Sequence, residues 1–277
     1  VVAAMTDPNP KVSGQGLTKL SDAGIETSSG LLETQARELN SGFLSRMERG
    51  RPYVRLKLAM SVDGRTAMAS GESKWITGAE ARADVQQLRA RSSAVITGIG
   101  SILSDDSSLT VRAEQLSNRV ASQFTDYQPL RLVLDSELRM PLNAKMLTLA
   151  GRTLIVTSAD LASEKGIALK KAGAELLALG NTDGRVDLLR LMEYLATEES
   201  VNELLIETGA ELAAAFIEAR LVDELWVYMA PKLMGSDARP LVKLDFESMS
   251  EAIDLSLKDM RQIGNDIRMI WQFKAPE

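Results

Sequence analysis

Three ionisable side chains stand out because their sequence surroundings are unusual for charged groups. Lys57 lies inside the apolar run 53–61, where an ammonium is costly unless it reaches a cleft or a carboxylate. Glu207 ends a second apolar run, and the carboxyl ends of strands in open α/β sheets face the ligand crevice. Asp105 begins an Asp-Asp pair that could equally be a solvated turn. The Asp-Asp pair could also supply acid/base carboxylates, and Glu207 could equally be a solvated strand end.

The absence of two residue types narrows the chemistry further. The 277-residue chain contains no His and no Cys, which excludes disulfides, Cys/His zinc sites, thiol nucleophiles and Ser-His-Asp triads. Proton transfer must therefore use Asp, Glu, Lys, Tyr or water. An enzyme of this composition is expected to obtain its chemistry from a cofactor. The lack of Cys is compatible with the cytoplasm.

Charge and hydropathy point to a small-molecule ligand. The net charge of −6 and the pI near 5.1 argue against a nucleic-acid surface. No apolar run approaches the roughly 20 residues of a membrane span. The first ten residues, VVAAMTDPNP, lack the basic start of a signal peptide and are expected to come from the interior of a longer chain or a trimmed one. Arg89 and Arg112 could clamp a phosphate, although surface arginines are common.

Two glycine-containing turns could approach a phosphate. Gly98-Ile99-Gly100-Ser101 follows an apolar run, but it lacks the full dinucleotide-binding pattern and could be a plain tight turn. Glu207-Thr208-Gly209 precedes a helix of small residues, whose first N–H groups could hold a phosphate. Ordinary strand-to-helix packing would also explain that glycine. Trp75 could stack on a cofactor ring or pack on the core.

Alternating strands and helices are expected to position these residues. We predict a mostly parallel sheet with helices on both faces, closed by an antiparallel hairpin around Gly264-Asn265. A helix is expected to begin at Thr77, with Glu80 completing a capping box, and to run to Ser92. The expected strands are 53–61, 94–97, 130–134, 153–157, 174–179, 203–207, 225–229, 253–260 and 267–273, and the further helices are 161–171, 186–197 and 209–220.

The first part of the chain has its own pattern. Helices are expected at 16–23 and 33–47, and Gly50-Arg51-Pro52 then interrupts the chain. This part contains too little apolar mass to be a domain alone, so we expect an appended piece.

Five spaced blocks identify a family. They read KLAMSVDGR at 57–65, GESKWIT at 71–77, DD at 105–106 with LTVR at 109–112, ETG at 207–209, and LVDE at 221–224 with APKLMG at 230–235. With them, residues 48–277 resemble the reductase domain of the bifunctional riboflavin-biosynthesis deaminase/reductase. The resemblance implies a dihydrofolate-reductase-like fold. It also implies NADPH-dependent reduction of the ribosyl group of 5-amino-6-(5-phosphoribosylamino)uracil to a ribityl group, in a cytoplasmic homodimer or larger homo-oligomer.

Residues 1–47 resemble the end of the same family's deaminase domain. That domain holds zinc with His and Cys, which this chain lacks, so zinc is expected only in a deaminase part that carries them. The sequence in hand is therefore expected to reduce but not to deaminate.

The resemblance also assigns site residues. Lys57 is expected near the substrate ribose, and Lys57, Asp105 and Glu207 are the candidates for proton delivery and sugar orientation. Glu211 is bulkier than the Pro or Gly common in the family. The substrate set is Ser73, Arg89, Leu109, Arg112 and Glu207; the NADPH set is Ala59, Trp75, Ser101, Asp105, Ser136, Gly209, Ala210, Glu211, Leu212, Ala213, Ala214 and Ala215. A pterin-type NADPH reductase on the same fold and a non-catalytic nucleotide-binding module are the alternatives.

Overall fold

The computed structural model describes residues 1–122, 124 and 127–273. These residues form two compact units, each described by itself below. One unit comprises Val1–Tyr53 and Met192–Glu203, and the other comprises Val54–Leu191 and the described chain from Leu204 onward. Within the described residues, no helix is long and apolar enough to cross a membrane.

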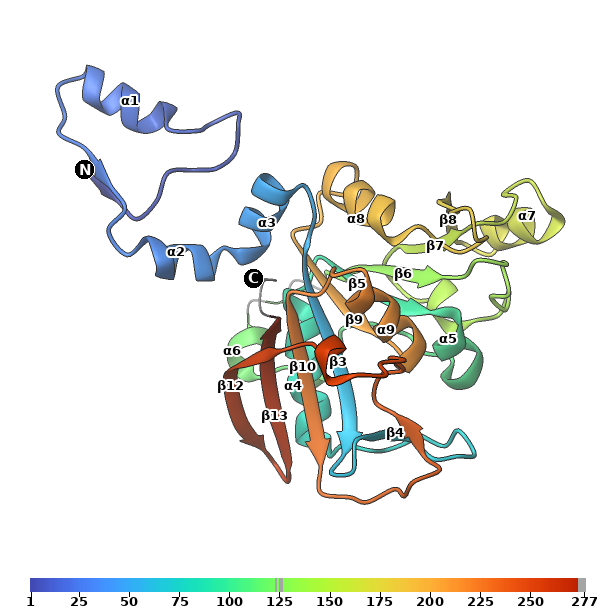
Figure 1. The fold of residues 1–277 in the computed structure, drawn as a ribbon. Helices are drawn as coiled ribbons and strands as arrows, with labels where there is room; N and C mark the ends of the chain where they lie inside the picture. The colour runs from blue at the N-terminus through green and yellow to red at the C-terminus, as the bar shows by residue number, and fades with distance from the viewer. Residues whose placement is uncertain (123, 125–126, 274–277) are drawn as a thin grey trace. The chain divides into compact units, whose positions relative to one another are not determined.

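A nine-stranded sheet forms the centre of the larger unit, in the order β12-β13-β10-β3-β9-β5-β6-β7-β8 (Figure 1). The pairs β10–β3, β5–β9, β5–β6, β6–β7 and β7–β8 are parallel, whereas β13 runs antiparallel to both β10 and β12. This confirms the expected dihydrofolate-reductase-like class of fold. The strands are β3 (Tyr53–Ser61), β5 (Ala94–Gly98), β6 (Leu130–Leu134), β7 (Thr153–Thr157), β8 (Glu175–Ala178), β9 (Glu203–Glu207), β10 (Glu224–Ala230), β12 (Leu255–Ile263) and β13 (Asp266–Phe273).

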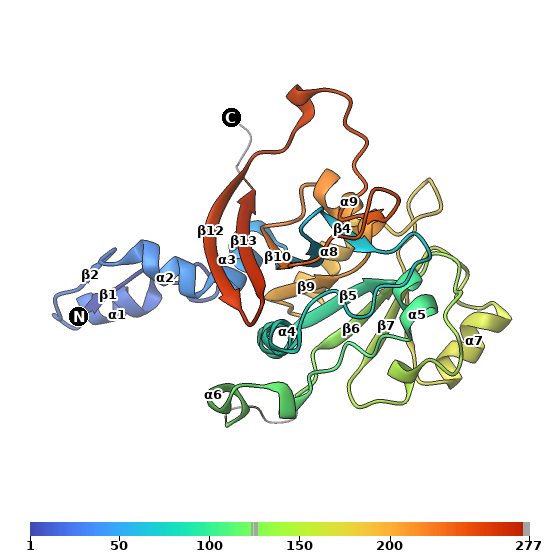
Figure 2. The same ribbon diagram turned by 90° about the horizontal axis from the view of Figure 1, so that it is seen from below.

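Helices cover both faces of this sheet, which is why β6 and β7 are buried along their whole length. Figure 2 shows α4 and α9 on opposite faces. On the α4 side, Val85 and Leu88 pack in one cluster with Val95, Leu205 and Tyr228 of three strands. The helices of this unit are α4 (Ala79–Arg91), α5 (Ile99–Asp105), α6 (Asn118–Ala121), α7 (Glu164–Lys171) and α9 (Ala210–Glu218), with short 3-10 turns at Ala113–Gln115, Lys145–Leu147 and Met249–Glu251. Helix α8 (Leu188–Thr197) begins in this unit and belongs to the smaller one from Met192 onward.

The start of α4 differs from the prediction. Gly78, not Thr77, is the N-cap residue, and no side chain of its own caps the helix. The Gly78 N–H donates instead to Asp266 Oδ2 at 2.6 Å, across 188 positions of sequence. The Thr77 carbonyl accepts from Arg82 Nη1 at 2.7 Å. The predicted capping box is therefore wrong, because a carboxylate from β13 takes its place.

A small sheet was also not predicted. β4 (Arg65–Ala67) pairs antiparallel with β11 (Arg239–Pro240), which brings together two loops far apart in the sequence. The strands are too short to show a clear alternation of apolar and polar residues.

The smaller unit contains α1 (Gln15–Asp22), α2 (Glu33–Leu39), α3 (Ser41–Arg49) and the parallel pair β1 (Val2–Ala3) and β2 (Ser28–Ser29). The single helix predicted for 33–47 is thus two helices. Asn40 separates them, and its side-chain amide donates to the Ala36 carbonyl at 2.9 Å. In α3, a Cβ on Gly42 would lie 2.5 Å from Glu203 Cγ, so this helix packs closely on the 202–203 segment.

Candidate active site

A cleft of about 1510 Å³ opens at the carboxyl ends of β3, β5, β6 and β9. All of its lining residues belong to the larger unit. Strand β11 contributes Arg239 and Pro240 to its wall. This is the position at which open α/β sheets bind ligands, because the loops that follow parallel strands diverge there.

Most of the predicted site residues line this cleft. Ala213 and Ala214 do not: they are 0% and 4% exposed, because the helical repeat turns them toward the core. Trp75 and Arg112 are also absent from the lining. The predicted residues that do line the cleft are Lys57, Ala59, Ser73, Arg89, Ser101, Asp105, Leu109, Ser136, Glu207, Gly209, Ala210, Glu211, Leu212 and Ala215.

Trp75 and Arg112 have other surroundings. The Trp75 side chain is 60% exposed, and the Arg82 guanidinium lies 4.5 Å from its ring centroid. Arg112 is exposed, and its backbone N–H donates to Gln86 Oε1 at 3.0 Å. Their roles in binding NADPH and substrate stay predictions.

Arg89 and Glu207 form a bidentate, mostly buried ion pair. Arg89 Nε and Nη2 lie 2.5 and 2.9 Å from the two Glu207 carboxylate oxygens, and Nη1 donates to the Thr110 carbonyl at 3.0 Å. Burial alone would raise the pKa of Glu207, but Arg89, followed by Lys57, outweighs it and holds that pKa below its ordinary value. Arg89 was predicted to clamp a phosphate; here its donors are engaged by Glu207 and Thr110, and the clamp stays a prediction.

Lys57 is a second charged residue of the cleft, and it is half-buried. Within the described chain, its ammonium makes no hydrogen bond and no ion pair, and the Tyr228 ring centroid lies 5.9 Å from Nζ. Burial lowers the pKa of Lys57, and the charge of Glu207 offsets this only in part. A desolvated ammonium of this kind gives up its proton more readily than an exposed lysine.

Asp105 ends α5 and lies at a more open part of the cleft. Its carboxylate is 3.4 Å from Lys74 Nζ, and both side chains are partly exposed. The turn 98–101 proves to be the start of α5, with Gly98 as N-cap. Leu109 adopts a left-handed conformation with φ of 52° yet is only 4% exposed. Such a backbone is uncommon for Leu and occurs more often at functional sites.

The start of α9 presents free space to a ligand. Gly209 is its N-cap with φ of −83°, a value open to any residue, and a Cβ there would meet no atom within 4 Å. No side chain caps the first turn. Glu211 is 84% exposed and lies 3.5 Å from Lys243 Nζ, which partly neutralises its charge. The N–H groups of this turn therefore suit an anion.

Comparison with known proteins decides the family. Residues 52–269 match the RibD C-terminal domain. The chain belongs to this family. It is 42% identical over 271 residues to the riboflavin biosynthesis protein RibD of Escherichia coli, covering 96% of this chain and 72% of the relative. It is 42% identical over 281 residues to RibD of Haemophilus influenzae, covering 99% and 73%.

Solved structures agree. RibD of Acinetobacter baumannii (form 1) is similar at a TM-score of 0.88 and 41% identity, covering 99% of this chain and 73% of that one. The riboflavin biosynthesis reductase Rib7 of Saccharomyces cerevisiae, at a TM-score of 0.60 and 17% identity, shares the fold; it covers 86% of this chain and 100% of that one. The chain is an oxidoreductase of the riboflavin pathway that acts on a pyrimidine.

Aspartates in two of the sequence blocks of this RibD-family reductase accept backbone hydrogen bonds that stabilise the fold. Asp63 accepts the N–H of Met234 and of Gly235, which ties block 57–65 to block 230–235. A hydrogen bond from the Ser61 hydroxyl, followed by these backbone donors, lowers the pKa of Asp63 to about 2. Asp223 similarly accepts the Val54 N–H at 2.8 Å.

Sequence reasoning missed two residues of the reductase site. Thr97 lines the cleft, and its hydroxyl is buried with no hydrogen-bond partner among the described residues. Tyr228 is 0% exposed and lies behind Lys57. Neither has a sequence signal, because each is one ordinary residue in an apolar strand.

Proposed function

We propose that this chain catalyses the NADPH-dependent reduction of the ribosyl group of 5-amino-6-(5-phosphoribosylamino)uracil to the ribityl group. The supporting observation is that one cleft contains the half-buried Lys57, the fixed Arg89–Glu207 pair and the uncapped start of α9. A polar reducible sugar and a phosphate-bearing cofactor need these three features together.

The cleft fits NADPH, which supplies a hydride when bound. The open space at Gly209 would admit a pyrophosphate close to the backbone, and the first-turn N–H groups of α9 would hold it. Ala59 is small enough to leave room beside β3 for a flat ring. We propose that Ser101, Asp105 and Ser136 contact the rest of the cofactor, since all three line the same cleft.

The remaining chemistry needs one proton and a fixed sugar. As the sugar C1–O bond breaks, we propose that the Lys57 ammonium protonates the ring oxygen while the nitrogen lone pair forms a C1–N double bond. Hydride addition at C1 returns that electron pair to nitrogen, so one hydride and one proton are consumed. Glu207, held by Arg89, would accept hydrogen bonds from sugar hydroxyls. Asp105 is the alternative proton carrier.

The substrate phosphate is proposed to meet Ser73 and Arg112, with Arg89 joining only if it exchanges Glu207 for the phosphate. Leu109 would pack against the substrate. From the family resemblance we also propose that residues 1–47 are the end of a deaminase domain, that zinc belongs only to a part bearing His and Cys, and that the enzyme is a cytoplasmic homo-oligomer.

The test is NADPH oxidation with the deaminated and the undeaminated pyrimidine ribotide, side by side. We expect turnover of the deaminated compound alone. If NADPH binds but is not oxidised with either ribotide, the chain is a non-catalytic nucleotide-binding module. Equal turnover of a substrate without phosphate would remove the phosphate from recognition.

A further inference from the structure

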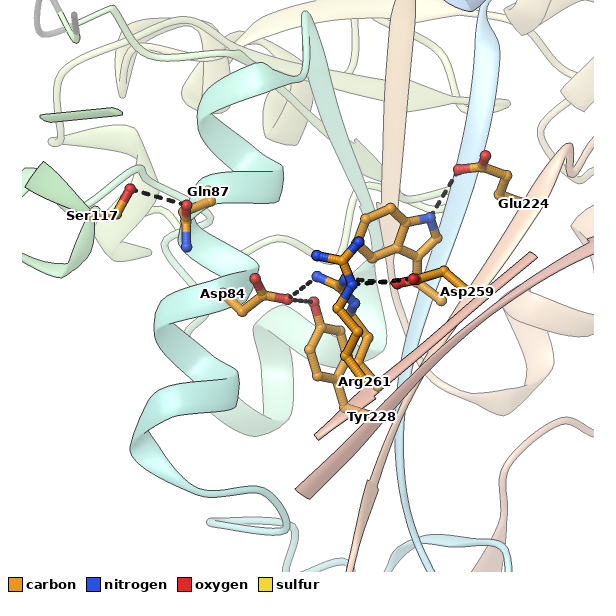
Figure 3. A network of polar contacts seen from close by, with 9 residues as sticks. Asp84, Gln87, Ser117, Glu224, Tyr228, Asp259 and Arg261 are labelled. Carbon is orange, nitrogen blue, oxygen red and sulfur yellow. Dashed lines mark hydrogen bonds and ion pairs between the residues drawn. The ribbon is translucent and has the colours of Figure 1, made fainter. Parts of the chain in front are cut away.

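A partly buried polar network is linked to Lys57 through the ring of Tyr228. Tyr228 of β10 is 0% exposed, and its ring centroid is 5.9 Å from Lys57 Nζ. Its hydroxyl donates to Asp84 Oδ2 at 2.7 Å. Figure 3 shows Asp84 projecting from α4 toward this hydroxyl. The ring is therefore held at its far end by a carboxylate while its face lies toward the ammonium.

Strands β13 and β12 extend this network: Arg268 of β13 binds Asp84, and Asp259 of β12 binds Arg268. Arg268 of β13 donates from Nη1 to Asp84 Oδ2 and from Nη2 to Asp259 Oδ2 of β12, each at 2.9 Å. Its guanidinium lies 5.0 Å from the Trp226 ring centroid. Asp84 therefore has two donors on one oxygen, and neither the Tyr228 hydroxyl nor the Arg268 guanidinium can move away without breaking a partly buried hydrogen bond.

We propose that Tyr228 is a positioning residue for the reduction: its ring face stabilises the Lys57 ammonium, and Asp84 with Arg268 fixes the ring. The proposal rests on the proposed role of Lys57. A half-buried ammonium that makes no hydrogen bond with the described residues has lost part of its hydration, and an aromatic face within about 6 Å partly replaces it. A hydroxyl that donates to a carboxylate makes its ring more electron-rich, which strengthens this attraction.

Two charged side chains act on Lys57 directly, and two more act through its neighbours. Glu207 of β9 favours the ammonium, and Arg89 of α4 opposes it. Arg112 acts on Glu207, and Asp84 acts through Tyr228. Burial, followed by the charge of Asp84, raises the pKa of Tyr228, so its hydroxyl stays protonated and remains the donor. Because the Tyr228 hydroxyl is uncharged, replacing Tyr228 with Leu or Phe adds and removes no ionised side chain.

The experiment compares Tyr228→Leu, which removes the ring, with Tyr228→Phe, which keeps it. The first readout is the titration of Lys57 in the full chain by NMR of ¹³Cε-labelled lysine, assigned with Lys57→Met. The second is the pH profile of kcat with NADPH and the deaminated ribotide. We expect Tyr228→Leu to lower the Lys57 pKa, and with it the alkaline limb of kcat, by about 0.5–1 unit. Tyr228→Phe should restore most of both.

Phe216→Leu is the control for the loss of a buried ring, because Phe216 is 0% exposed and belongs to α9, the helix on the sheet face opposite α4 (Figure 2). It should lower Tm without moving the Lys57 titration. An unchanged Lys57 pKa in Tyr228→Leu, or an equal shift in Tyr228→Phe or Phe216→Leu, would overturn the proposal. The NMR titration reads the ring's effect even if wild-type protein oxidises no NADPH, a result that would instead count against the proposed function.

Discussion

At the scale of single residues, Glu207 and Lys57 of the cleft are both charged and largely screened from water, but they differ in how their charge is compensated. Glu207 has a bidentate partner in Arg89, whereas Lys57, among the described residues, has the face of an aromatic ring and the charge of Glu207 but no hydrogen bond or ion pair. A paired charge contributes to the fold, while an unpaired one costs stability. The difference suggests that Glu207 is a fixed acceptor and that Lys57 is kept for proton transfer.

Replacing Lys57 with Met should therefore separate activity from stability. We expect kcat to fall by about 10²-fold or more, because a proton donor is lost, while the Kd for NADPH is kept. Tm should rise by about 2–4 °C for each kcal/mol of removed desolvation cost. The exposed Lys170→Met on α7 is the matched control, with both quantities unchanged. An unchanged kcat in Lys57→Met would remove this lysine from the mechanism.

Loss of Arg89 should leave Glu207 as a buried charge without its partner. We expect Arg89→Met to reduce the free energy of unfolding by about 3–5 kcal/mol near neutral pH, and Arg89→Met/Glu207→Gln to recover most of it. The pKa of Glu207 is lowered in the folded state, so its contribution is present above the ordinary value of 4.5 and is lost as pH falls through the folded value. The defect should therefore shrink in acid.

Urea denaturation at neutral and acid pH measures this effect. Arg152→Met is the matched control, since Arg152 and Glu175 form an exposed bidentate pair. Arg152→Met should reduce the free energy of unfolding by less than about 1 kcal/mol. A defect in Arg89→Met as small as that of the control would show that the buried pair adds nothing.

At the scale of elements, the position of Arg89 depends on how α4 begins. This helix starts at Ala79 and is capped from β13 by Asp266, a residue that is 3% exposed. The closing hairpin therefore does more than cover a sheet edge: it fixes the first turn of the helix that carries Arg89 to the cleft and Asp84 to Tyr228.

Asp266→Ala should accordingly destabilise the protein by about 1–3 kcal/mol, because the Gly78 N–H loses its acceptor. Thr77→Ala should change the free energy of unfolding by less than about 0.5 kcal/mol, since Thr77 does not cap the helix. Denaturant titration of both variants decides between the two caps. A larger loss of unfolding free energy in Thr77→Ala than in Asp266→Ala would show that Thr77 caps the helix after all.

At the scale of the whole molecule, the two compact units have different tasks. Every residue that lines the cleft belongs to the larger unit. Within the smaller unit, α3 is the well-packed helix, with Leu44 only 5% exposed and Gly42 tight against the 202–203 segment. Helices α1 and α2 contain no buried residue.

Removing residues 1–40 should thus leave kcat unchanged and Tm within a few degrees, because α3 is retained. Removing residues 1–49 should reduce the free energy of unfolding by about 2–5 kcal/mol, because buried apolar contacts such as those of Leu44 are lost. Thermal unfolding and NADPH oxidation of both shortened chains measure this. Loss of activity in the first would place part of the reductase in residues 1–40.

The sequence by itself determined the class of fold, the order of the strands along the chain, the family and a set of site residues most of which line the cleft. These follow from local patterns: apolar runs, turn residues and short blocks such as 57–65 and 207–209. Only the tertiary structure decided that Asp266 caps α4, that Arg89 is bound to Glu207, and that Tyr228 lies behind Lys57. Each of these contacts joins residues more than 100 positions apart, and no local pattern encodes a partner at that distance.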